Sequence, residues 1–193
     1  MPGDCPVHVT VRVKAGLPSL REVKLVREWR RSLAEASERG SFRVAHYSLQ
    51  GDHAHLIVEA HGKRALACGM KSIGARLARA LNRTSGRRGA VLDGRYHHRS
   101  LRSPREVRRV LAYVLLNARR HLAKRRHVTR AAPAPAFDPA SSARWFDGWR
   151  HGVAAEASGL PEVARPRSWL LRLGWRRHGL VDPRELPGAP APA

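Results

Sequence analysis

Acidic residues are scarce in this sequence: 15 Asp and Glu stand against 37 Lys and Arg, which gives a formal net charge of +22. So large a charge resists compaction and attracts polyanions over a long range, with nucleic acid as the usual partner. In the stretch 63–130, twenty Lys and Arg face only Asp93 and Glu106, so +18 of the total lies there. An arginine-rich composition alone does not explain why acidic residues vanish from this one stretch.

Cysteine and long apolar runs are also nearly missing. Cys5 and Cys68 lie far apart and form no CxxC pair, which excludes a zinc–cysteine site and leaves one disulfide as an unsupported option. No apolar run approaches the length of a membrane span, and the N-terminus lacks the charged start and apolar stretch of a signal peptide. We therefore expect a cytoplasmic protein that binds no membrane. Hydrophobic residues still make up 42% of the chain, enough to bury a core.

Hydrophobic periodicity predicts four strands and three helices. Period-two alternation indicates strands over 7–13, 41–50, 53–60 and 95–101. Apolar positions at helical spacing indicate helices over 19–39, 63–82 and 104–126. Gly51 and Asp52 form a turn signal that makes the two middle strands a hairpin. Ser19 and Ser103 stand where N-caps are expected, and Gly40 where the first helix should end.

The order of these elements, β, α, β, β, α, β, α, is that of a ferredoxin-like α+β fold. It predicts an antiparallel sheet with helices packed on one face, an extra helix and a helical C-terminal extension. A Pro/Ala-rich linker at 131–140 separates the domain 1–130 from the basic extension 141–193. We expect the tryptophans of the extension to pack it onto the first domain, with stacking on unpaired bases as the alternative. They are four of the five in the chain: Trp145, Trp149, Trp169 and Trp175.

His53 and His55 are the first candidates for chemistry. Residues i and i+2 of a strand point to the same side of the sheet, so the two imidazoles would lie side by side. Such a pair suits a shared divalent metal. In a chain with 11 histidines the pattern also arises by chance, and two histidines on a solvent-facing strand are the alternative.

Tyr113 and Asn117 are the second pair. They stand four residues apart on the predicted helix 104–126, which would place them on one face. A tyrosine can act as a covalent nucleophile, and an Asn carbonyl is a hard oxygen ligand suited to Mg²⁺ or Mn²⁺. The alternative is that Tyr113 is an ordinary core residue of an amphipathic helix.

Taken together, these residues resemble those of the HUH-type single-tyrosine transposases, in particular the REP-associated tyrosine transposase branch. The resemblance covers about residues 7–127 and rests on the segments GDHAHLIVEA, GRYHHRSLRSP and YVLLNARRH. The small Ala54 stands where the family usually has a larger hydrophobic residue. The resemblance implies that His53, His55 and Asn117 bind the metal, Mg²⁺ or Mn²⁺, and that Tyr113 is the nucleophile.

The implied function is that of a DNA transposase, a metal-dependent endonuclease and ligase of single strands. It would cleave and rejoin single-stranded or hairpin DNA through a 5′-phosphotyrosine intermediate. Family members often act as dimers, so a homodimer is possible. Domain 1–130 would then be the HUH catalytic domain.

Basic residues around this constellation are expected to contact phosphates, with a solvated face as the alternative. They are Arg83, Arg87, Arg88, Arg105, Arg108, Arg109, Arg119 and Arg120. His121 follows Asn117 by four residues and is a further candidate ligand or supporting group. Tyr96 and His98 are candidates for an auxiliary role near DNA, against simple packing on the sheet.

Other functions stay open on the sequence alone. A catalytically silent DNA- or RNA-binding protein of the same fold would share the charge but not the chemistry. An unrelated RNA-binding protein would need aromatic residues on its strands, and the predicted strands hold few: Phe42, Tyr47 and Tyr96. A metal-dependent hydrolase without a covalent step is a further alternative.

Overall fold

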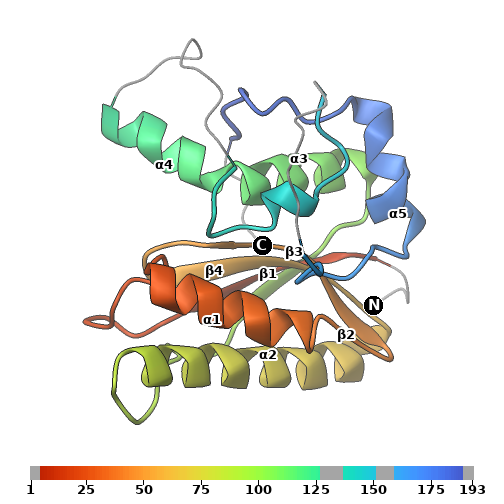
Figure 1. Cartoon of the computed structure of the whole chain (residues 1–193). Coiled ribbons are helices and arrows are strands. Elements are labelled where there is room, and N and C mark those ends of the chain that lie inside the picture. The colour runs from red at the N-terminus through yellow and green to blue at the C-terminus, as the bar shows by residue number, and fades with distance from the viewer. Residues whose placement is uncertain (1–4, 127–136, 151–158, 189–193) are drawn as a thin grey trace.

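A five-stranded antiparallel sheet lies between two layers of helices in the computed structural model of the chain (Figure 1). The structure describes residues 5–126, 137–150 and 159–188. Its strands are β1 (Val7–Arg12), β2 (Glu38–Arg39), β3 (Phe42–Leu49), β4 (His53–Ala60) and β5 (His97–Ser100). Its helices are α1 (Val23–Ala34), α2 (Gly62–Thr84), α3 (Pro104–Leu115), α4 (Asn117–Arg126), η1 (Ala143–Trp145), α5 (Trp169–Arg172) and η2 (Gly174–His178).

The strand order β2-β3-β4-β1-β5 results from two interleaved crossovers. The crossover β1–α1–β3 leaves a gap that β4 fills, and the crossover β4–α2–β5 leaves a gap that β1 fills. This is the split βαβ arrangement, and it confirms the predicted α+β class with an antiparallel sheet. Within the described residues, no helix has both the length and the apolar character of a membrane span. Cys5 and Cys68 are both free.

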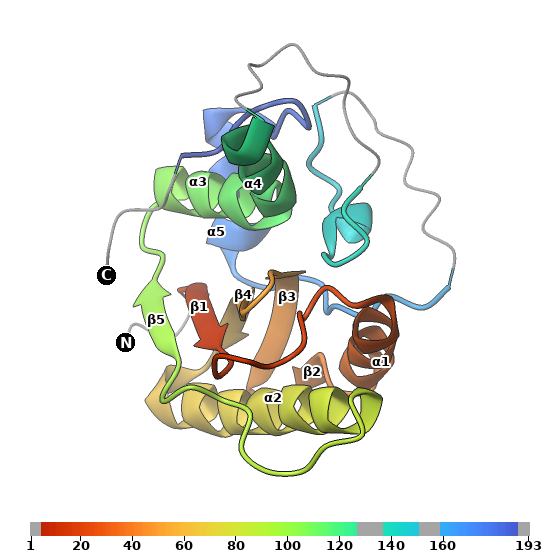
Figure 2. The ribbon, with the colours of Figure 1, turned by 90° about the vertical axis from the view of Figure 1, so that its left-hand side faces the viewer.

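Each face of the sheet has its own hydrophobic core. In the first core, Val7, Val9 and Val11 of β1, with alternate residues of β3 and β4, face α1 and α2. In the second core, on the other face, Ala45 and Ile57 pack with α3 and with parts of the C-terminal extension. Figure 2 shows α1 and α2 on one side of the sheet and α3, α4 and α5 on the other. Helices therefore cover both faces, and the polar positions of β1 and β4 point toward α3.

The first helix is shorter than predicted at both ends. Ser19 caps a turn by accepting from the Arg21 amide, and α1 itself begins after Glu22, whose side chain makes no capping bond. After Ala34 the chain forms the short strand β2 instead of more helix. Gly40, expected to end the helix, makes the tight β2–β3 turn with a φ of 53°. Pairing with the sheet edge thus overrides helix propensity over the last residues of the prediction.

The predicted helix over 104–126 is in fact two helices. Its start is confirmed: Ser103 and Glu106 form a reciprocal capping box, and Pro104 occupies the first turn. The break comes at Leu116, whose φ of −106° and ψ of 16° end α3 before α4 begins. Tyr113 and Asn117 therefore lie on consecutive helices and not on one continuous helix.

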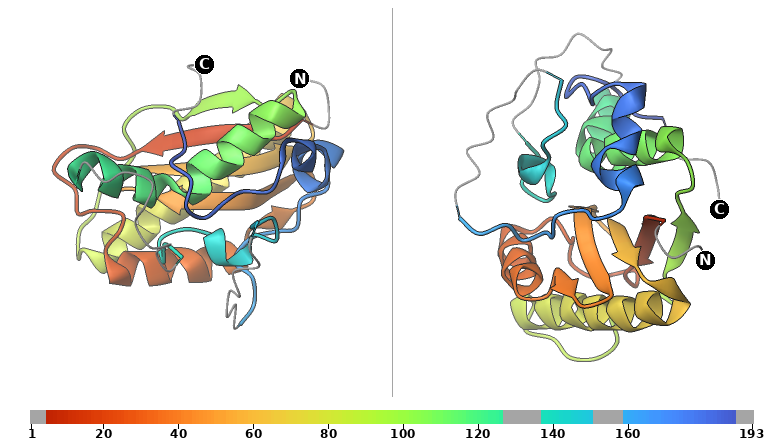
Figure 3. Two further views of the ribbon diagram at one scale, coloured as in Figure 1. Left: turned by 90° about the horizontal axis from the view of Figure 1, so that it is seen from above. Right: turned by 90° about the vertical axis from the view of Figure 1, so that its right-hand side faces the viewer.

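The C-terminal extension packs mainly on the α3 side of the sheet, and its residues Trp145 and Val163 also reach the core beside α1 and α2. Trp149 and Trp175 are 6% and 1% exposed in the second core, whereas Trp169 is 49% exposed. The carboxylate of Glu162 is buried, accepts hydrogen bonds from Tyr47 on β3 and from an indole of the extension, and pairs with two arginines. Figure 3 shows the C-terminal segment, residues 179–188, running along α3. Of the predicted linker 131–140, residues 131–136 lie outside the described part of the chain.

His46 on β3 is buried beneath this extension. Its ring meets Phe146 edge to face, with centroids 5.4 Å apart, and its Nδ1 lies 3.4 Å from the Ser142 hydroxyl. Burial lowers the pKa of His46 to about 4, although Asp147 acts in the opposite direction. The folded chain therefore holds this imidazole in its neutral form.

We expect acid to destabilise the protein through His46. In the unfolded chain its pKa is near 6.5, so its contribution to stability is present above that pH and is lost as the pH falls toward 4. The free energy of unfolding should fall by roughly 3 kcal/mol, from about 1.4 kcal/mol for each unit of pKa difference. Urea denaturation at pH 7 and pH 4.5 measures it, and His46→Leu should show a smaller difference between the two pH values. Equal differences in wild type and variant would contradict the assignment.

Candidate catalytic site

The sheet face toward α3 carries an imidazole pair. His53 and His55 are on β4, opposite Arg12 and Thr10 of β1 in the strand register. Alternation turns both histidines away from the first core. Their Nε2 atoms are 3.2 Å apart, and the two rings meet edge to face. Two ring nitrogens thus converge on one point above the sheet.

Each ring is held from behind through its Nδ1 atom. His53 donates its Nδ1–H to the carboxylate of Asp52 over 2.6 Å, and this hydrogen bond is the main reason that the pKa of Asp52 is lowered. Nδ1 of His55 lies 3.2 Å from the Thr10 hydroxyl and 3.2 Å from Nε2 of His8. Supporting groups of this kind fix the orientation and tautomer of metal-binding imidazoles.

His55 is the more deeply buried of the pair, with 5% of its surface exposed. Burial lowers the pKa of His55 to about 2, helped by the charges of His8, His53, His121 and Arg12. The predicted candidate His121 therefore lies within electrostatic range of this ring. His55 is neutral near physiological pH, so a nitrogen lone pair is available for a ligand.

Tyr113 reaches the imidazole pair from α3. Its hydroxyl is 3.4 Å from Nε2 of His55, and the two rings meet edge to face with centroids 5.1 Å apart. The guanidinium of Arg120 lies over the tyrosine ring, 5.3 Å from its centroid. The ring is half-buried at the edge of the second core, so the hydroxyl is at the polar face and not in the apolar interior.

The other two tyrosines have structural positions. Tyr47 is fully buried and donates to Glu162. Tyr96 packs partly buried against the first core, with its ring 5.7 Å from that of His98. Tyr113 is accordingly the tyrosine that the described structure brings to the imidazole pair.

Asn117 opens α4 and is fully buried, yet neither its amide oxygen nor its amide nitrogen has a hydrogen-bond partner. A buried amide left unpaired costs about 1–3 kcal/mol, so such a group usually has a partner, such as an ion or a water. Across the described ranges, no group of three or more His, Cys, Asp or Glu residues is placed to hold a metal ion. An Asn oxygen is a hard ligand outside that set.

No protein-family model matches the sequence, and a search of curated proteins finds no significant match. A search of solved structures finds a REP-associated tyrosine transposase bound to a REP hairpin. That structure superposes with a TM-score of 0.47 and 14% sequence identity, over 62% of this chain and 69% of the other.

Two of the three predicted phosphate contacts on the α2 side have partners of their own. Arg83 pairs with Glu28 of α1, and Arg87 donates to Asn82. Arg88 follows in the exposed loop after α2. Because α2 packs on the face of the sheet away from Tyr113, the structure does not bring Arg83 to the imidazole pair.

The predicted contacts on α3 and α4 divide into two groups. Arg108 pairs with Glu185, and Arg119 is buried with its Nε donating to a backbone carbonyl of the C-terminal segment. Arg105 and Arg109 are exposed and form no ion pair within the described residues. Arg120 lies over the tyrosine ring, so among the predicted contacts it is the cation that the structure places directly at Tyr113.

Four residues of the site were not among the sequence candidates: His8, Thr10, Arg12 and Asp52. The signal was in β1, where VHVTVR places a polar residue at every second position of an otherwise β-branched strand. Once β1 pairs with β4, those positions fall beside His53 and His55. Asp52 was visible only as part of a turn.

Proposed function

We propose that this protein is a metal-dependent enzyme that nicks and rejoins single-stranded DNA through Tyr113, as a transposase of the HUH single-tyrosine type does. The observation that carries the proposal is the convergence of three groups. The Tyr113 hydroxyl and the two imidazole Nε2 atoms form a chain of contacts of 3.4 and 3.2 Å on one sheet face. The +22 charge of the chain supports a nucleic acid as substrate.

The residues present fit a divalent metal. His53 and His55 would offer their Nε2 atoms, since Asp52 accepts the Nδ1–H of His53 and the Thr10 hydroxyl can accept that of His55. Asn117 would supply a hard oxygen, and its unpaired buried amide supports that role. When bound, Mg²⁺ or Mn²⁺ would act as a Lewis acid on the scissile phosphate.

The reaction proposed for Tyr113 is a direct displacement at phosphorus. Its phenolic oxygen attacks in line and releases its proton to solvent water as the new P–O bond forms. The bond from phosphorus to the 3′ oxygen breaks, and that oxygen takes up a proton from solvent and leaves as a hydroxyl. The Arg120 guanidinium near the ring stabilises negative charge on the oxygen and on the phosphate.

The product is a 5′-phosphotyrosine, which preserves the reactivity of the broken phosphodiester. A free 3′-hydroxyl can therefore reverse the reaction without a nucleotide cofactor. One nucleophile for each chain allows one nick at a time, so a transfer of two ends needs two chains or two successive reactions.

A trapping experiment tests the proposal. We expect wild-type protein, incubated with end-labelled single-stranded hairpin DNA and Mn²⁺, to form an adduct that survives denaturant, because the link is covalent. EDTA should prevent the adduct, and a fully duplex control should give little. Binding without any adduct across a panel of hairpins would favour the catalytically silent DNA-binding protein.

A further inference from the structure

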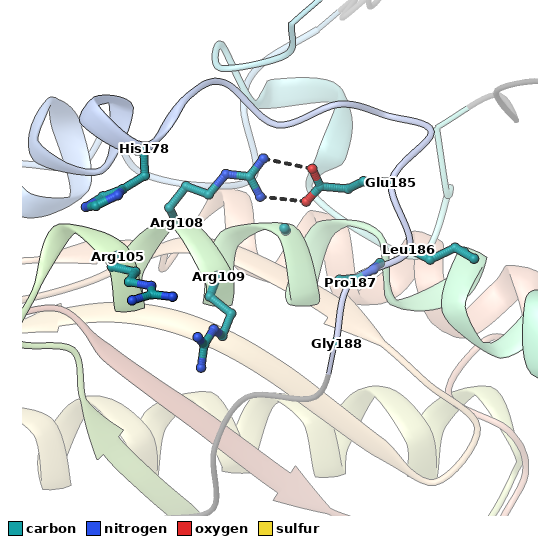
Figure 4. Close-up of a pocket in the computed structure, with 9 residues that line it drawn as sticks. Arg105, Arg108, Arg109, His178, Glu185, Leu186, Pro187 and Gly188 are labelled. Atoms are coloured by element: carbon teal, nitrogen blue, oxygen red, sulfur yellow. Dashed lines mark hydrogen bonds and ion pairs between the residues drawn. The ribbon is translucent and has the colours of Figure 1, made fainter. Parts of the chain in front are cut away.

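A cavity of about 390 Å³ lies between α3 and the C-terminal segment. Figure 4 shows Arg105, Arg108 and Arg109 of α3 around it, with His178 of η2 and Glu185 of the C-terminal segment. Three cations thus share a concave surface with a single carboxylate. We call this space the α3 cavity.

Arg108 is committed to holding the C-terminal segment in place. Its guanidinium forms a two-point ion pair with Glu185, over 2.6 and 2.7 Å, and donates to the backbone carbonyls of Gly179 and Leu180. The hydrogen bond to Glu185 also raises the pKa of Arg108. Arg108 therefore lines the cavity in a fixed position, with its charge compensated by Glu185.

Arg105 and Arg109 differ from Arg108 in having no such partner. Both are exposed, and within the described residues neither forms an ion pair or a side-chain hydrogen bond. In Figure 4 they extend from the side of α3 away from the Arg108–Glu185 pair. The cavity therefore presents two uncompensated guanidinium groups to an incoming anion.

Arg105 and Arg109 lie on the same side of α3 as the candidate nucleophile, Tyr113. Arg105, Arg109 and Tyr113 recur at every fourth residue of α3, so they lie on one side of the helix. Each step advances roughly 6 Å along the axis, from a rise of about 1.5 Å for each residue. That step is comparable to the separation of neighbouring phosphates along an extended single strand.

We propose that the α3 cavity binds the backbone of single-stranded DNA beside the scissile phosphate, with Arg109 on the neighbouring phosphate and Arg105 on the next one. The inference rests on the proposed function, since it takes the position of Tyr113 as the point of cleavage. Arg108 makes no phosphate contact in this proposal, although the sequence alone made it a candidate together with Arg105 and Arg109. A side chain that pairs with Glu185 would have to break that pair before it could bind DNA.

The test compares two double variants that remove the same charge. R105Q/R109Q changes the α3 cavity, and R64Q/K71Q changes exposed residues of α2 in the layer beyond the sheet. Binding of fluorescent single-stranded hairpin DNA is measured by anisotropy at several salt concentrations. We expect the slope of log K against log salt to fall by about 1.4 in R105Q/R109Q, at about 0.7 for each lost phosphate contact, and affinity near 0.1 M salt to fall on the order of tenfold. R64Q/K71Q should stay near wild type.

Neutral methylphosphonate linkages, introduced one at a time, locate the contacts. Wild type should lose affinity when either of the first two linkages on one side of the cleavage site is neutral. R105Q/R109Q should be insensitive to the same changes. R105Q/R109Q should still form the covalent adduct at saturating DNA. If wild type forms the adduct but the two double variants bind alike, the α3 cavity proposal is wrong and the proposed function stands. If wild type forms no adduct, the proposed function itself fails.

Discussion

Tyr113→Phe is expected to abolish the covalent protein–DNA adduct, to below the limit of detection, and to leave DNA binding nearly intact. The substitution removes one oxygen, the atom that would bond to phosphorus. The ring keeps its packing against the second core, its edge contact with His55 and the guanidinium of Arg120 above it. Binding should change by less than about fivefold, since a single hydroxyl contact contributes about 1 kcal/mol. Gel analysis after denaturation measures the adduct, and anisotropy measures the binding.

Tyr96→Phe is the matched control, because it removes the same atom from another half-buried tyrosine near a histidine. It should form the adduct at the wild-type rate. An adduct that persists in Tyr113→Phe would show that another residue is the nucleophile. Loss of DNA binding together with the adduct would show that the substitution damages the fold, which thermal denaturation of the variant would detect independently.

The sheet could be predicted from the sequence because its pattern is local. The strand 53–60 matches β4 residue for residue, and the order of elements alone leads to the split βαβ arrangement. The pair of histidines could also be placed on one face, because alternation along a strand needs no tertiary information. Hydrophobic period and chain order were therefore enough to place both the sheet and its imidazole pair.

The break between α3 and α4 could not be predicted from the local sequence pattern. The residues around Leu116 are all compatible with a helix, so local propensity predicts one continuous element. The break places Leu116 and Asn117 in buried positions, 7% and 0% exposed, and this depends on how α3 packs on the second core. Because the orientation of Asn117 depends on that break, its role as a ligand stays a proposal that helical spacing alone cannot support.

Tertiary contacts also decide which arginines of α3 have an ion-pair partner. Arg105, Arg108 and Arg109 look equivalent in the sequence, but within the part of the chain that the structure describes only Arg108 meets a carboxylate. That carboxylate, of Glu185, is 77 residues away in the chain. Nothing near Arg108 in the sequence indicates Glu185. The charge excess of the segment favours a polyanion partner, but it does not say which cations are available to bind one.

His53→Ala is expected to lower metal-dependent cleavage at least about 100-fold, which exceeds the roughly 10- to 100-fold effect of losing a group that only supports a ligand. The His53 side chain is 17% exposed at the start of β4, and its removal leaves no buried charge without a partner. The free energy of unfolding should therefore change by less than about 1 kcal/mol. Cleavage rates at increasing Mn²⁺, with urea denaturation alongside, measure both quantities.

Two further variants separate a metal ligand from a residue that merely shapes the site. Asp52→Asn keeps His53 but weakens the charged hydrogen bond to its Nδ1, so about 10- to 100-fold more Mn²⁺ should restore a near-normal rate. His61→Ala removes an exposed histidine at the opposite end of β4 and should change neither rate nor metal requirement. In His53→Ala, excess Mn²⁺ should fail to restore the rate, because the lost group is a donor atom and not its support. A full rescue of His53→Ala by metal, or an unchanged Mn²⁺ requirement in Asp52→Asn, would mean that this imidazole binds no ion and that the chemistry of Tyr113 depends on something else.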